Sequence, residues 1–434
     1  MNSFARALQV AATVATLGIC LPDCVAIAEN WPQWRGANLD GRSSETGIPT
    51  RWSKTENVLW KLELPGPAGS TPVIWDDRIY LTSVEGDQLV LMAVSAEGKM
   101  LWKQGVTQGN RNVRDDEGNF ASPSPCTDGK HVWAFFANGV LGCYRAEDGK
   151  EVWKLDLQER YGKFDIAFGM TSTPVLAGYR LYLQLIHGDG NPATREAVIV
   201  ALDKNNGKEI WKVARPSDAK AECEHSYASP VIYRDEKQAF LLTHGADYVI
   251  AHDLRDGHEL WRCGNLNPLG SYNNTLRFVA TPVASQGRIV VPSAKNGPVL
   301  CLKPDGTGDV TERQEQYFWK RDAGTPDVPS PVIHDGLVYL CRENGNLVCL
   351  DAETGKEHYE KRTMPDRYRA SPVYADGKIF VAGRKGVVTV VKTGPNFEQL
   401  AQNDMQEEIS ASPAISNGRI YLRTFKNLYA IGTK

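Results

Sequence analysis

The sequence lacks an excess of charge of either sign. Its 434 residues include 49 Lys and Arg against 52 Asp and Glu, which leaves a formal net charge of −3. A nucleic-acid-binding surface needs a basic face or stripe that meets the phosphates, and no such segregation is visible. No RNA- or DNA-binding motif is present either. We therefore expect no nucleic-acid partner.

Long apolar runs are also scarce. The main one, residues 7–21, follows Arg6 and precedes the small residues of Ala26-Ile27-Ala28. A basic start, a short apolar core and a small-x-small cleavage pattern are typical of a secretory signal, here residues 1–28. The run is too short for a transmembrane helix. The sequence predicts an exported protein, periplasmic or secreted, without a transmembrane segment.

Cysteine is sparse and does not form an evident disulfide framework. Cys20 and Cys24 fall in the leader, and neither follows the small residue that lipid attachment would need. An odd number remains afterwards, so at least one is unpaired in a monomer. The seven remaining cysteines are Cys126, Cys143, Cys223, Cys263, Cys301, Cys341 and Cys349.

Two of these cysteines, Cys341 and Cys349, fall on adjacent expected strands. If Asn344-Gly345 is a two-residue hairpin loop, Cys341 stands opposite Val348. Residues opposite each other share a face of the sheet, and neighbours along a strand alternate. This register directs the two thiols to different faces, and we expect no bridge between them.

What the sequence has in abundance is a repeat. A small residue, a proline and an apolar pair recur eight times, at steps of 53, 49, 56, 52, 49, 41 and 41 residues. Repeats of about 40–50 residues that hold four short strands each are typical of β-propeller blades. The marker prolines are Pro72, Pro125, Pro174, Pro230, Pro282, Pro331, Pro372 and Pro413.

A second marker is an aromatic residue on the last strand of each unit. It precedes the first proline marker at Trp60, whereas the last unit, 412–431, contains only three strands. The pattern therefore predicts that residues 58–62 complete the last blade and close the ring, which removes exposed sheet edges. The seven closing aromatics are Trp60, Trp102, Trp153, Trp211, Trp261, Trp319 and Tyr359. We expect these side chains to pack between neighbouring blades rather than to bind a cofactor.

A small residue marks the third strand in the same way. There it would let neighbouring sheets approach closely, and it explains three of the cysteines as buried substitutes for alanine. The positions are Ala93, Cys143, Ala201, Ala251, Cys301, Cys349 and Ala430. Together the markers predict an all-β, eight-bladed propeller of four-stranded antiparallel blades over residues 57–434.

Units such as 348–356 (VCLDAETGK) and 201–211 (ALDKNNGKEIW) resemble the pyrroloquinoline-quinone (PQQ)-like propeller repeat. That family includes quinoprotein alcohol dehydrogenases and BamB-type outer-membrane assembly lipoproteins. The resemblance covers residues 57–432. The segment 31–36 (WPQWRG) also resembles the start of exported PQQ-like propellers of planctomycete-type bacteria. The resemblance specifies the fold and leaves the chemistry open.

Residues 29–56 form a Trp-rich lead-in before the first strand. We interpret them as a strap packed along the outside of the ring, and the alternative is an exposed aromatic strip that binds a partner. The connections from a closing aromatic to the next proline are 23, 21, 19 and 21 residues long in the first part of the ring, but 12 and 13 later. Long loops gathered on one face of a rigid scaffold favour binding there.

The candidate binding residues come from these connections and from the long hairpin 187–196. Six of them, from His225 onward in the order given below, immediately precede inner strands and should rim the central funnel, whereas the first three stand in long loops of the same face. An ordinary solvated rim of ion pairs is the alternative. The candidates are Arg111, Arg114, His187, His225, Tyr227, Arg277, Arg367, Arg369 and Glu408.

Signals for metal or catalytic chemistry are weak. Cys223-Glu224-His225 offers two soft ligands without a second pair, unlike paired zinc motifs. No Gly-x-Ser-x-Gly elbow is present. We expect no metal site and no catalytic residue.

Two functions remain in view. The first is a monomeric, non-catalytic binding or scaffold propeller, similar to BamB-type proteins, that presents its loop face to a protein, peptide or glycan of the cell envelope. The second is a PQQ- and calcium-dependent dehydrogenase. The resemblance implies for such enzymes a lid of two adjacent cysteines and an Asp base. No two cysteines are adjacent, no Cys-x-x-Cys-His haem motif occurs, and no motif selects among Asp165, Glu222 and Asp366. We expect the first function and no cofactor.

Overall fold

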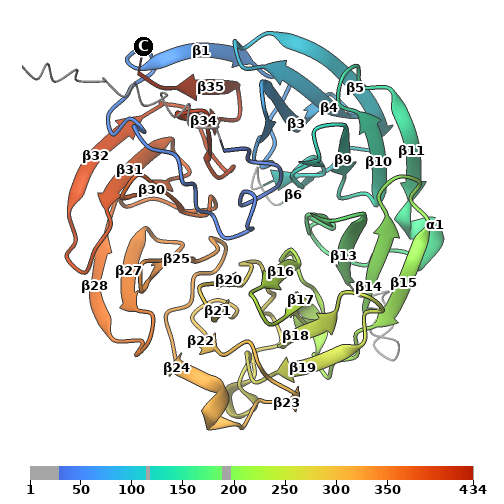
Figure 1. Cartoon of the computed structure of the whole chain (residues 1–434), viewed down its shortest axis with the longest axis vertical. Coiled ribbons are helices and arrows are strands. Elements are labelled where there is room, and N and C mark those ends of the chain that lie inside the picture. Colours follow the sequence, from blue (N-terminus) through green and yellow to red (C-terminus); the bar gives the residue numbers. More distant parts are fainter. Residues whose placement is uncertain (1–28, 114–117, 188–196, 434) are drawn as a thin grey trace, which may run out of the picture.

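The computed structural model describes residues 29–113, 118–187 and 197–433, so the predicted signal segment, Arg114 and most of the 187–196 hairpin lie outside the described residues. Eight sheets stand around a central axis as the blades of a propeller (Figure 1). Each blade is an antiparallel sheet whose innermost strand is short. The all-β, eight-bladed prediction is confirmed.

The strands of the first four blades follow in chain order from the inside outward. They are β2 (Val73–Trp75), β3 (Arg78–Glu85), β4 (Gln88–Ser95) and β5 (Met100–Gln108); β8 (Cys126–Thr127), β9 (His131–Phe135), β10 (Val140–Arg145) and β11 (Glu151–Asp156); β12 (Val175–Ala177), β13 (Arg180–Ile186), β14 (Ala197–Asp203) and β15 (Glu209–Ala214); and β16 (Val231–Arg234), β17 (Ala239–Gly245), β18 (Tyr248–Asp253) and β19 (Glu259–Cys263).

The other four blades repeat this order. They are β20 (Val283–Ser285), β21 (Arg288–Pro292), β22 (Val299–Leu302) and β24 (Tyr317–Arg321); β25 (Val332–His334), β26 (Leu337–Cys341), β27 (Asn346–Asp351) and β28 (Glu357–Arg362); β29 (Val373–Ala375), β30 (Lys378–Ala382), β31 (Val387–Lys392) and β32 (Gln399–Asp404); and β33 (Ala414–Ser416), β34 (Arg419–Arg423), β35 (Asn427–Ile431) and β1 (Val58–Glu63). A short extra strand, β23 (Gly308–Asp309), runs parallel to β19.

The ring is closed by its two ends, as predicted. β1 pairs with β35 and is the outermost strand of the eighth blade, with Lys61 opposite Tyr429 (Figure 1). β1 covers the edge of β35, which the last three strands of the chain would otherwise leave unpaired. Closure therefore comes from a contact between residues far apart in the sequence.

The repeated tryptophans join neighbouring blades. Trp102 stands opposite Ala93 in its own sheet, and its indole donates a hydrogen bond to the Ala146 carbonyl of the next blade at 3.0 Å. A Cβ on Gly149 would lie 2.7 Å from the Trp102 ring, so glycine is required there. The same arrangement recurs at Trp60, whose ring lies against Gly98. The structural interpretation of these rings is thus correct.

A second set of links runs around the channel. The residue before each marker proline carries a hydroxyl, and its backbone N–H donates to the equivalent hydroxyl of the next blade. Seven such bonds form, of which Thr173 N to Ser229 Oγ at 2.9 Å is typical. The hydroxyl of Thr71 has no partner within the described chain, which places the break at the seam between the last and first blades. The eight residues are Thr71, Ser124, Thr173, Ser229, Thr281, Ser330, Ser371 and Ser412.

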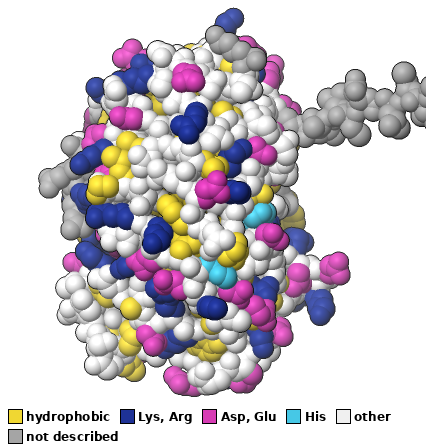
Figure 2. All heavy atoms as spheres, turned by 90° about the vertical axis from the view of Figure 1, so that its left-hand side faces the viewer, with side chains coloured by type: hydrophobic (Ala, Val, Ile, Leu, Met, Phe, Trp, Pro, Cys, Tyr) yellow, Lys and Arg dark blue, Asp and Glu magenta, His cyan; other side chains and the backbone are white. Residues whose placement is uncertain are grey.

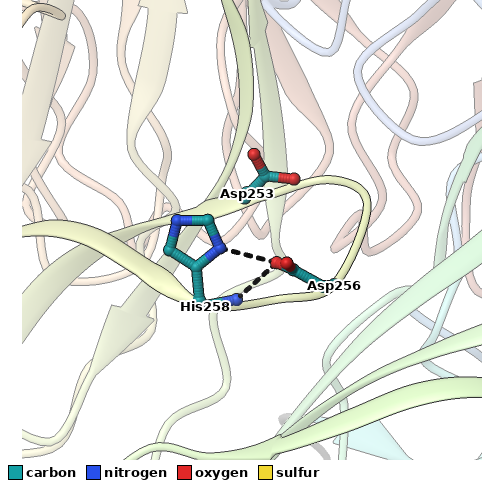
Figure 3. Close-up of side chains that lie close together, drawn as sticks. All are labelled: Asp253, Asp256 and His258. Atoms are coloured by element: carbon teal, nitrogen blue, oxygen red, sulfur yellow. Dashed lines mark hydrogen bonds and ion pairs between the residues drawn. The ribbon is translucent and has the colours of Figure 1, made fainter.

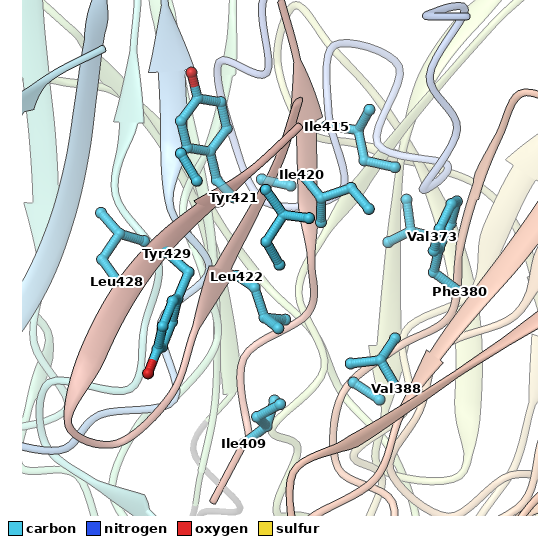
Figure 4. Close-up of a cluster of buried hydrophobic side chains, with 14 of the residues drawn as sticks. Val373, Phe380, Val388, Ile409, Ile415, Ile420, Tyr421, Leu422, Leu428 and Tyr429 are labelled. Atoms are coloured by element: carbon cyan, nitrogen blue, oxygen red, sulfur yellow. The ribbon is translucent and has the colours of Figure 1, made fainter. Parts of the chain in front are cut away.

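The hydrophobic core lies between blades rather than at one centre. Figure 4 shows one such layer, in which Val373 and Phe380 of the seventh blade face Ile415 and Ile420 of the eighth. These side chains are at most 1% exposed. Alternation along each strand sends one set of side chains to each neighbouring blade, so every sheet is buried on both faces.

The predicted hairpin register at Asn344-Gly345 is wrong by one residue. Cys341 stands opposite Leu347, and Arg342 N bonds to Asn346 O. Gly345 has a φ of 88°, whereas Asn344 does not take a positive φ. The loop is therefore a three-residue turn with a bulge at glycine rather than a two-residue type I′ turn. Cys341 and Cys349 share a face as a result.

No disulfide forms among the described cysteines, and all seven of them are buried. Burial raises the pKa of the Cys143 thiol to about 12 and that of Cys301 to about 12. Both sit opposite the closing aromatics of their own sheets, in the place of alanine.

The lead-in runs along the outside of the ring only at residues 50–52, where Trp52 N bonds to Asn403 Oδ1 and Arg51 bonds to Leu400 O of β32, the outermost strand of the seventh blade. The expectation is wrong for the part before these residues.

The earlier part of the lead-in crosses the centre of the face where the first and second strands of the blades turn (Figure 1). Trp31 pairs with Ile74 of the first blade, and Ser43 N bonds to Tyr374 O of the seventh. Trp31 is 1% exposed. The apolar side chains of this segment are buried in two places, because Trp52, 4% exposed, packs on Phe380 of the seventh blade with ring centroids 6.3 Å apart.

We call this covered side the turn face and the opposite side the loop face. Seen from one side of the ring, basic and acidic side chains are interspersed (Figure 2). On that side no region is dominated by one sign of charge, as the composition suggested.

Candidate functional site

The loop face carries the connections between blades together with the hairpins between second and third strands. Arg369, from a connection, bonds to Glu343 of such a hairpin at 2.7 Å, and Glu408 pairs with Arg384 at 3.3 Å in the same way. Four connections contain small elements of their own. These are β6 (Asn112–Val113) with β7 (Gly118–Asn119), α1 (Leu157–Tyr161), η1 (Ala221–Glu224) and η2 (Leu269–Ser271).

One group of predicted residues meets at the third and fourth blades. Arg277 donates to the Glu222 carboxylate at 2.5 Å and lies over the Phe168 ring at 4.5 Å. Phe168 in turn contacts the ring of Tyr227, with centroids 5.9 Å apart. Arg277 is thus neutralised by Glu222 and flanked by an aromatic side chain on the loop face.

The two predicted histidines lie beside this group. His187 packs on Phe164 with ring centroids 4.7 Å apart, and the Nδ1 of His225 is buried without a hydrogen-bond partner among the described residues. Burial lowers the pKa of His225, although Asp165 and Glu222 oppose that shift. His225 is therefore neutral at physiological pH.

A second group meets at the fifth to seventh blades, around a pocket of about 310 Å³. Its centre is Glu343, which accepts from Arg369 at 2.7 Å and lies 3.9 Å from Arg367. Asp327 adjoins Glu343, and burial together with that carboxylate raises the pKa of Asp327 to about 6. Burial also opposes ionisation of Glu343, but the hydrogen bond from Arg369 outweighs it and lowers the pKa of Glu343.

Both groups reach the central channel. A space of about 160 Å³ there is lined by Tyr227 from the first group, Arg369 from the second and six of the eight hydroxyl-bearing residues described above, all except Thr281 and Ser330. Trp34 of the lead-in lines the same space from the turn face. The lead-in therefore helps to enclose the channel space at the turn face.

Among the remaining residues considered from the sequence, Asp366 lines the pocket of the second group, whereas Arg111 does not. Arg111 is exposed on the connection after the first blade, and Arg114 is not among the described residues. The Asp366 carboxylate accepts from the backbone N–H groups of Arg367 and Lys385, which makes it part of a turn. Sequence reasoning missed Asp327 and Glu343, because a hairpin glutamate carries no motif.

Within the described chain, one set of side chains is close enough to share a metal ion: Asp253, Asp256 and His258, with ligand atoms within 4.8 Å of one another (Figure 3). His258 Nδ1 and Asp256 Oδ1 are 2.6 Å apart, and both Asp253 oxygens accept from Arg255. The set is a surface turn whose oxygens already have protein partners. It gives no basis for a metal centre.

The Cys223-Glu224-His225 segment does not gather ligands either. Cys223 is buried in η1, and its Sγ lies 3.2 Å from the Asn273 carbonyl oxygen and 3.3 Å from the Asn267 amide. Burial raises the pKa of this thiol, so it is protonated. A protonated thiol held in this way is a structural group.

Comparison with known proteins places the chain in a family. A family model described as outer membrane protein assembly factor BamB matches residues 49–183, 87–356 and 308–396. These overlapping matches extend over well more than half of the chain. The chain belongs to this BamB-like family.

Curated relatives are distant. The assembly factor BamB of Yersinia pestis is 23% identical over 250 residues, which is 54% of this chain and 54% of that protein. A polyvinylalcohol dehydrogenase of Pseudomonas sp. is 21% identical over 202 residues, 44% of this chain and 30% of that enzyme. The chain thus spans about half the length, or less, of these relatives.

Solved structures show the shared fold. BamB from Moraxella catarrhalis has a TM-score of 0.60 at 15% identity, over 87% of this chain and 97% of that chain. A europium-containing methanol dehydrogenase has a TM-score of 0.68 at 12% identity, over 93% and 89%. Quinohemoprotein alcohol dehydrogenase from Comamonas testosteroni scores 0.66 at 13% identity, over 93% and 81%. The fold of this BamB-like chain is therefore common to assembly factors and dehydrogenases. Among the described residues, no helix is long and apolar enough to cross a membrane.

Proposed function

We propose that this protein is an exported, monomeric and non-catalytic propeller that binds a protein or another cell-envelope component through its loop face. The observation that carries the proposal is the path of the lead-in, which covers the centre of the turn face with the protein's own chain. A partner is therefore expected to bind the loop face, where the long connections lie. The family membership supports an assembly role of the same kind.

The loop face offers a rigid, mixed surface for such a partner. Its arginines are held in place by carboxylates, as Arg277 is by Glu222 and Arg369 by Glu343. Fixed charges of both signs determine the position and orientation of a bound partner more than they strengthen its binding. Binding energy has to come from apolar side chains that a partner buries. Leu269 in η2 is such a side chain, since it is 78% exposed.

A quinoprotein dehydrogenase is the second candidate, because solved dehydrogenases share the fold. PQQ is a tricyclic quinone with three carboxylates, and small-molecule sites usually enclose about 300–1,000 Å³. The channel space of about 160 Å³ is below that range. The arginines at its mouth are already paired with carboxylates rather than free for an anionic cofactor. These residues do not fit the cofactor, and we derive no chemistry through it.

Cross-linking tests the partner face. A photoreactive amino acid placed at Arg367 or Asn273, both exposed on the loop face, is expected to give adducts with an envelope partner in the native organism. The matched positions Asp77 and Glu353 are equally exposed on the turn face and should give none. Adducts from the turn face alone would contradict the proposal.

A thermal-shift titration tests the second candidate. Saturating ligand at a hundredfold excess over its dissociation constant stabilises a protein by about 2.7 kcal/mol. We expect PQQ with Ca²⁺ to leave the melting temperature unchanged and the protein to show no dye-linked alcohol oxidation. A rise in melting temperature together with turnover would replace the scaffold proposal by the dehydrogenase.

A further inference from the structure

A groove on the loop face is independent of the channel. It measures about 1020 Å³ and lies between the connection after β15, the hairpin between β17 and β18, and the connection after β19. Residues around β23 close its outer end. None of its lining residues lines the channel space. The groove therefore needs its own explanation.

Asp247 lies in the wall of this groove and is 6% exposed. Its Oδ2 accepts a hydrogen bond from the Tyr272 hydroxyl at 2.6 Å, while its Oδ1 has no donor in the described chain. The nearby Asn267 amide does not supply one, because its hydrogens go to Cys223 Sγ and Asn273 O. A buried carboxylate oxygen without a donor is costly unless a ligand satisfies it.

The backbone at Asp247 has an unfavourable conformation. Ala246 and Asp247 form the turn between β17 and β18 with φ values of 46° and 65°. Left-handed φ is unfavourable for alanine and is usually taken by glycine in such turns. Strain of this kind persists where the surrounding structure fixes it, and here it directs a carboxylate into the groove wall.

The charge of the groove has one dominant sign. Its lining contains four carboxylates and two basic side chains. None of the four carboxylates makes an ion pair within the described residues. The carboxylates are Asp218, Asp247, Asp309 and Glu312, and the basic side chains are Lys220 and Arg313. An excess of unpaired negative charge attracts a cation.

Several kinds of ligand are disfavoured by these groups. A metal ion needs ligand atoms that converge, and the groove carboxylates do not converge in that way among the described residues. An anion would meet like charge. A neutral sugar could donate to Asp247 but would leave the negative charge uncompensated. An organic cation supplies both the hydrogen-bond donor and the charge.

The size of the groove suits an extended cation. The rings of Tyr248 and Tyr272 line the groove, but each already has a basic side chain over it: Arg262 lies 5.1 Å from the centre of the Tyr248 ring and Lys220 lies 5.9 Å from that of Tyr272. A bound cation would therefore depend on the carboxylates rather than on these rings. The volume is at the upper end of the range for small-molecule sites, which fits a chain rather than a single amine. We propose that this groove binds a linear polyamine, with an ammonium group that donates a hydrogen bond to Asp247 Oδ1. The inference does not depend on the partner proposed above.

Isothermal titration calorimetry of the purified protein with spermidine tests the inference. We expect binding that Asp247→Asn weakens about tenfold or more, since a charge-assisted hydrogen bond is lost. Asparagine keeps an acceptor for Tyr272 and tolerates positive φ, so the turn should fold. Asp218→Asn is a second variant on the neighbouring connection, and we expect a smaller loss there.

Asp256→Asn is the matched control, because it removes one negative charge from the same blade at the turn between β18 and β19, outside the groove lining. This variant should bind spermidine as the wild type does. Equal binding by Asp247→Asn, or no binding by the wild type, would overturn the inference. Binding of maltotriose or a lysine-rich peptide, but not of spermidine, would also overturn it.

The pH dependence adds a readout that a structural role would not give. Burial raises the pKa of Asp247 to about 6, with Asp218 adding to the shift while the hydrogen bond from Tyr272 and the positive charge of the buried Arg215 oppose it. Spermidine stays protonated well above this range. Its affinity for the wild type should therefore fall as the pH is lowered from 7 to 5, and that fall should be smaller in Asp247→Asn.

Discussion

Replacing Trp60 by alanine is expected to lower the free energy of unfolding by about 2 kcal/mol, less than the cost of removing a fully buried tryptophan, because Trp60 is only partly buried. Trp60 lies in β1, stands opposite Ala430, and donates from its indole to Ala96 O of the first blade at 2.7 Å. It also contacts the ring of Tyr421, with centroids 6.1 Å apart. A single side chain thus fastens the closing strand to two blades. Urea-induced unfolding followed by tryptophan fluorescence and circular dichroism measures the loss.

Trp153→Ala is the matched control for the seam. Trp153 makes the corresponding indole hydrogen bond at an interior junction, to Lys204 O at 3.0 Å, and stands opposite Cys143 in its own sheet. At that junction each blade is built from strands that follow one another in the sequence. β1, in contrast, pairs with β35 from the other end of the ring, and bringing these distant segments together costs conformational entropy. We expect Trp60→Ala to broaden the unfolding transition and Trp153→Ala to leave it sharp. Equal effects on both measures would show that the seam is not the weaker junction.

The architecture could be predicted because its signals are local and repeated. The proline markers, the closing aromatics and the small residues opposite them each recur at a fixed place in a blade, so an error in one unit is corrected by the others. Ring closure followed from the same counting, since Trp60 precedes the first marker. Strand positions in a propeller are fixed by turn residues and alternation, which are readable in sequence.

The hairpin register and the lead-in path were not readable in this way. Asn-Gly suits both a two-residue turn and a three-residue turn with a glycine bulge, and the difference shifts the pairing by one residue. The lead-in is held by contacts such as Arg35 to Pro372 O, across 337 residues of sequence. No local pattern encodes a contact of that separation.

The candidate site was predicted in part. Residues before inner strands do reach the channel mouth, as Tyr227 and Arg369 show. Their partners Asp327 and Glu343 come from other blades, and Asp247 stands in a turn that looked ordinary. The ring of hydroxyls had a sequence signal, because a Ser or Thr precedes every marker proline. Its role emerges only when the blades are placed side by side.

Replacing Arg35 is expected to have the second large effect on stability, because Arg35 holds the lead-in over the channel. It is 3% exposed, and its guanidinium donates to Pro372 O at 3.1 Å, to Asp40 O at 3.0 Å and to Pro331 O. Arg35→Ala would leave these carbonyls without a donor and open a cavity, at a cost of about 3 kcal/mol or more. Urea unfolding measures the cost, and limited proteolysis within residues 29–56 measures release of the lead-in.

Two further variants separate packing from hydrogen bonding at this position. Arg35→Met keeps much of the volume without donors, and Arg35→Lys keeps part of the donor set, so we expect stability to rank wild type above lysine above methionine above alanine. Burial lowers the pKa of Arg35 to about 10, partly offset by Asp40. Arg35 is therefore charged in both folded and unfolded states below that pH, and the cost of Arg35→Ala should be the same at pH 6 and pH 8. If methionine matched the wild type, the carbonyl contacts would contribute nothing, and the lead-in would be held by its tryptophans alone.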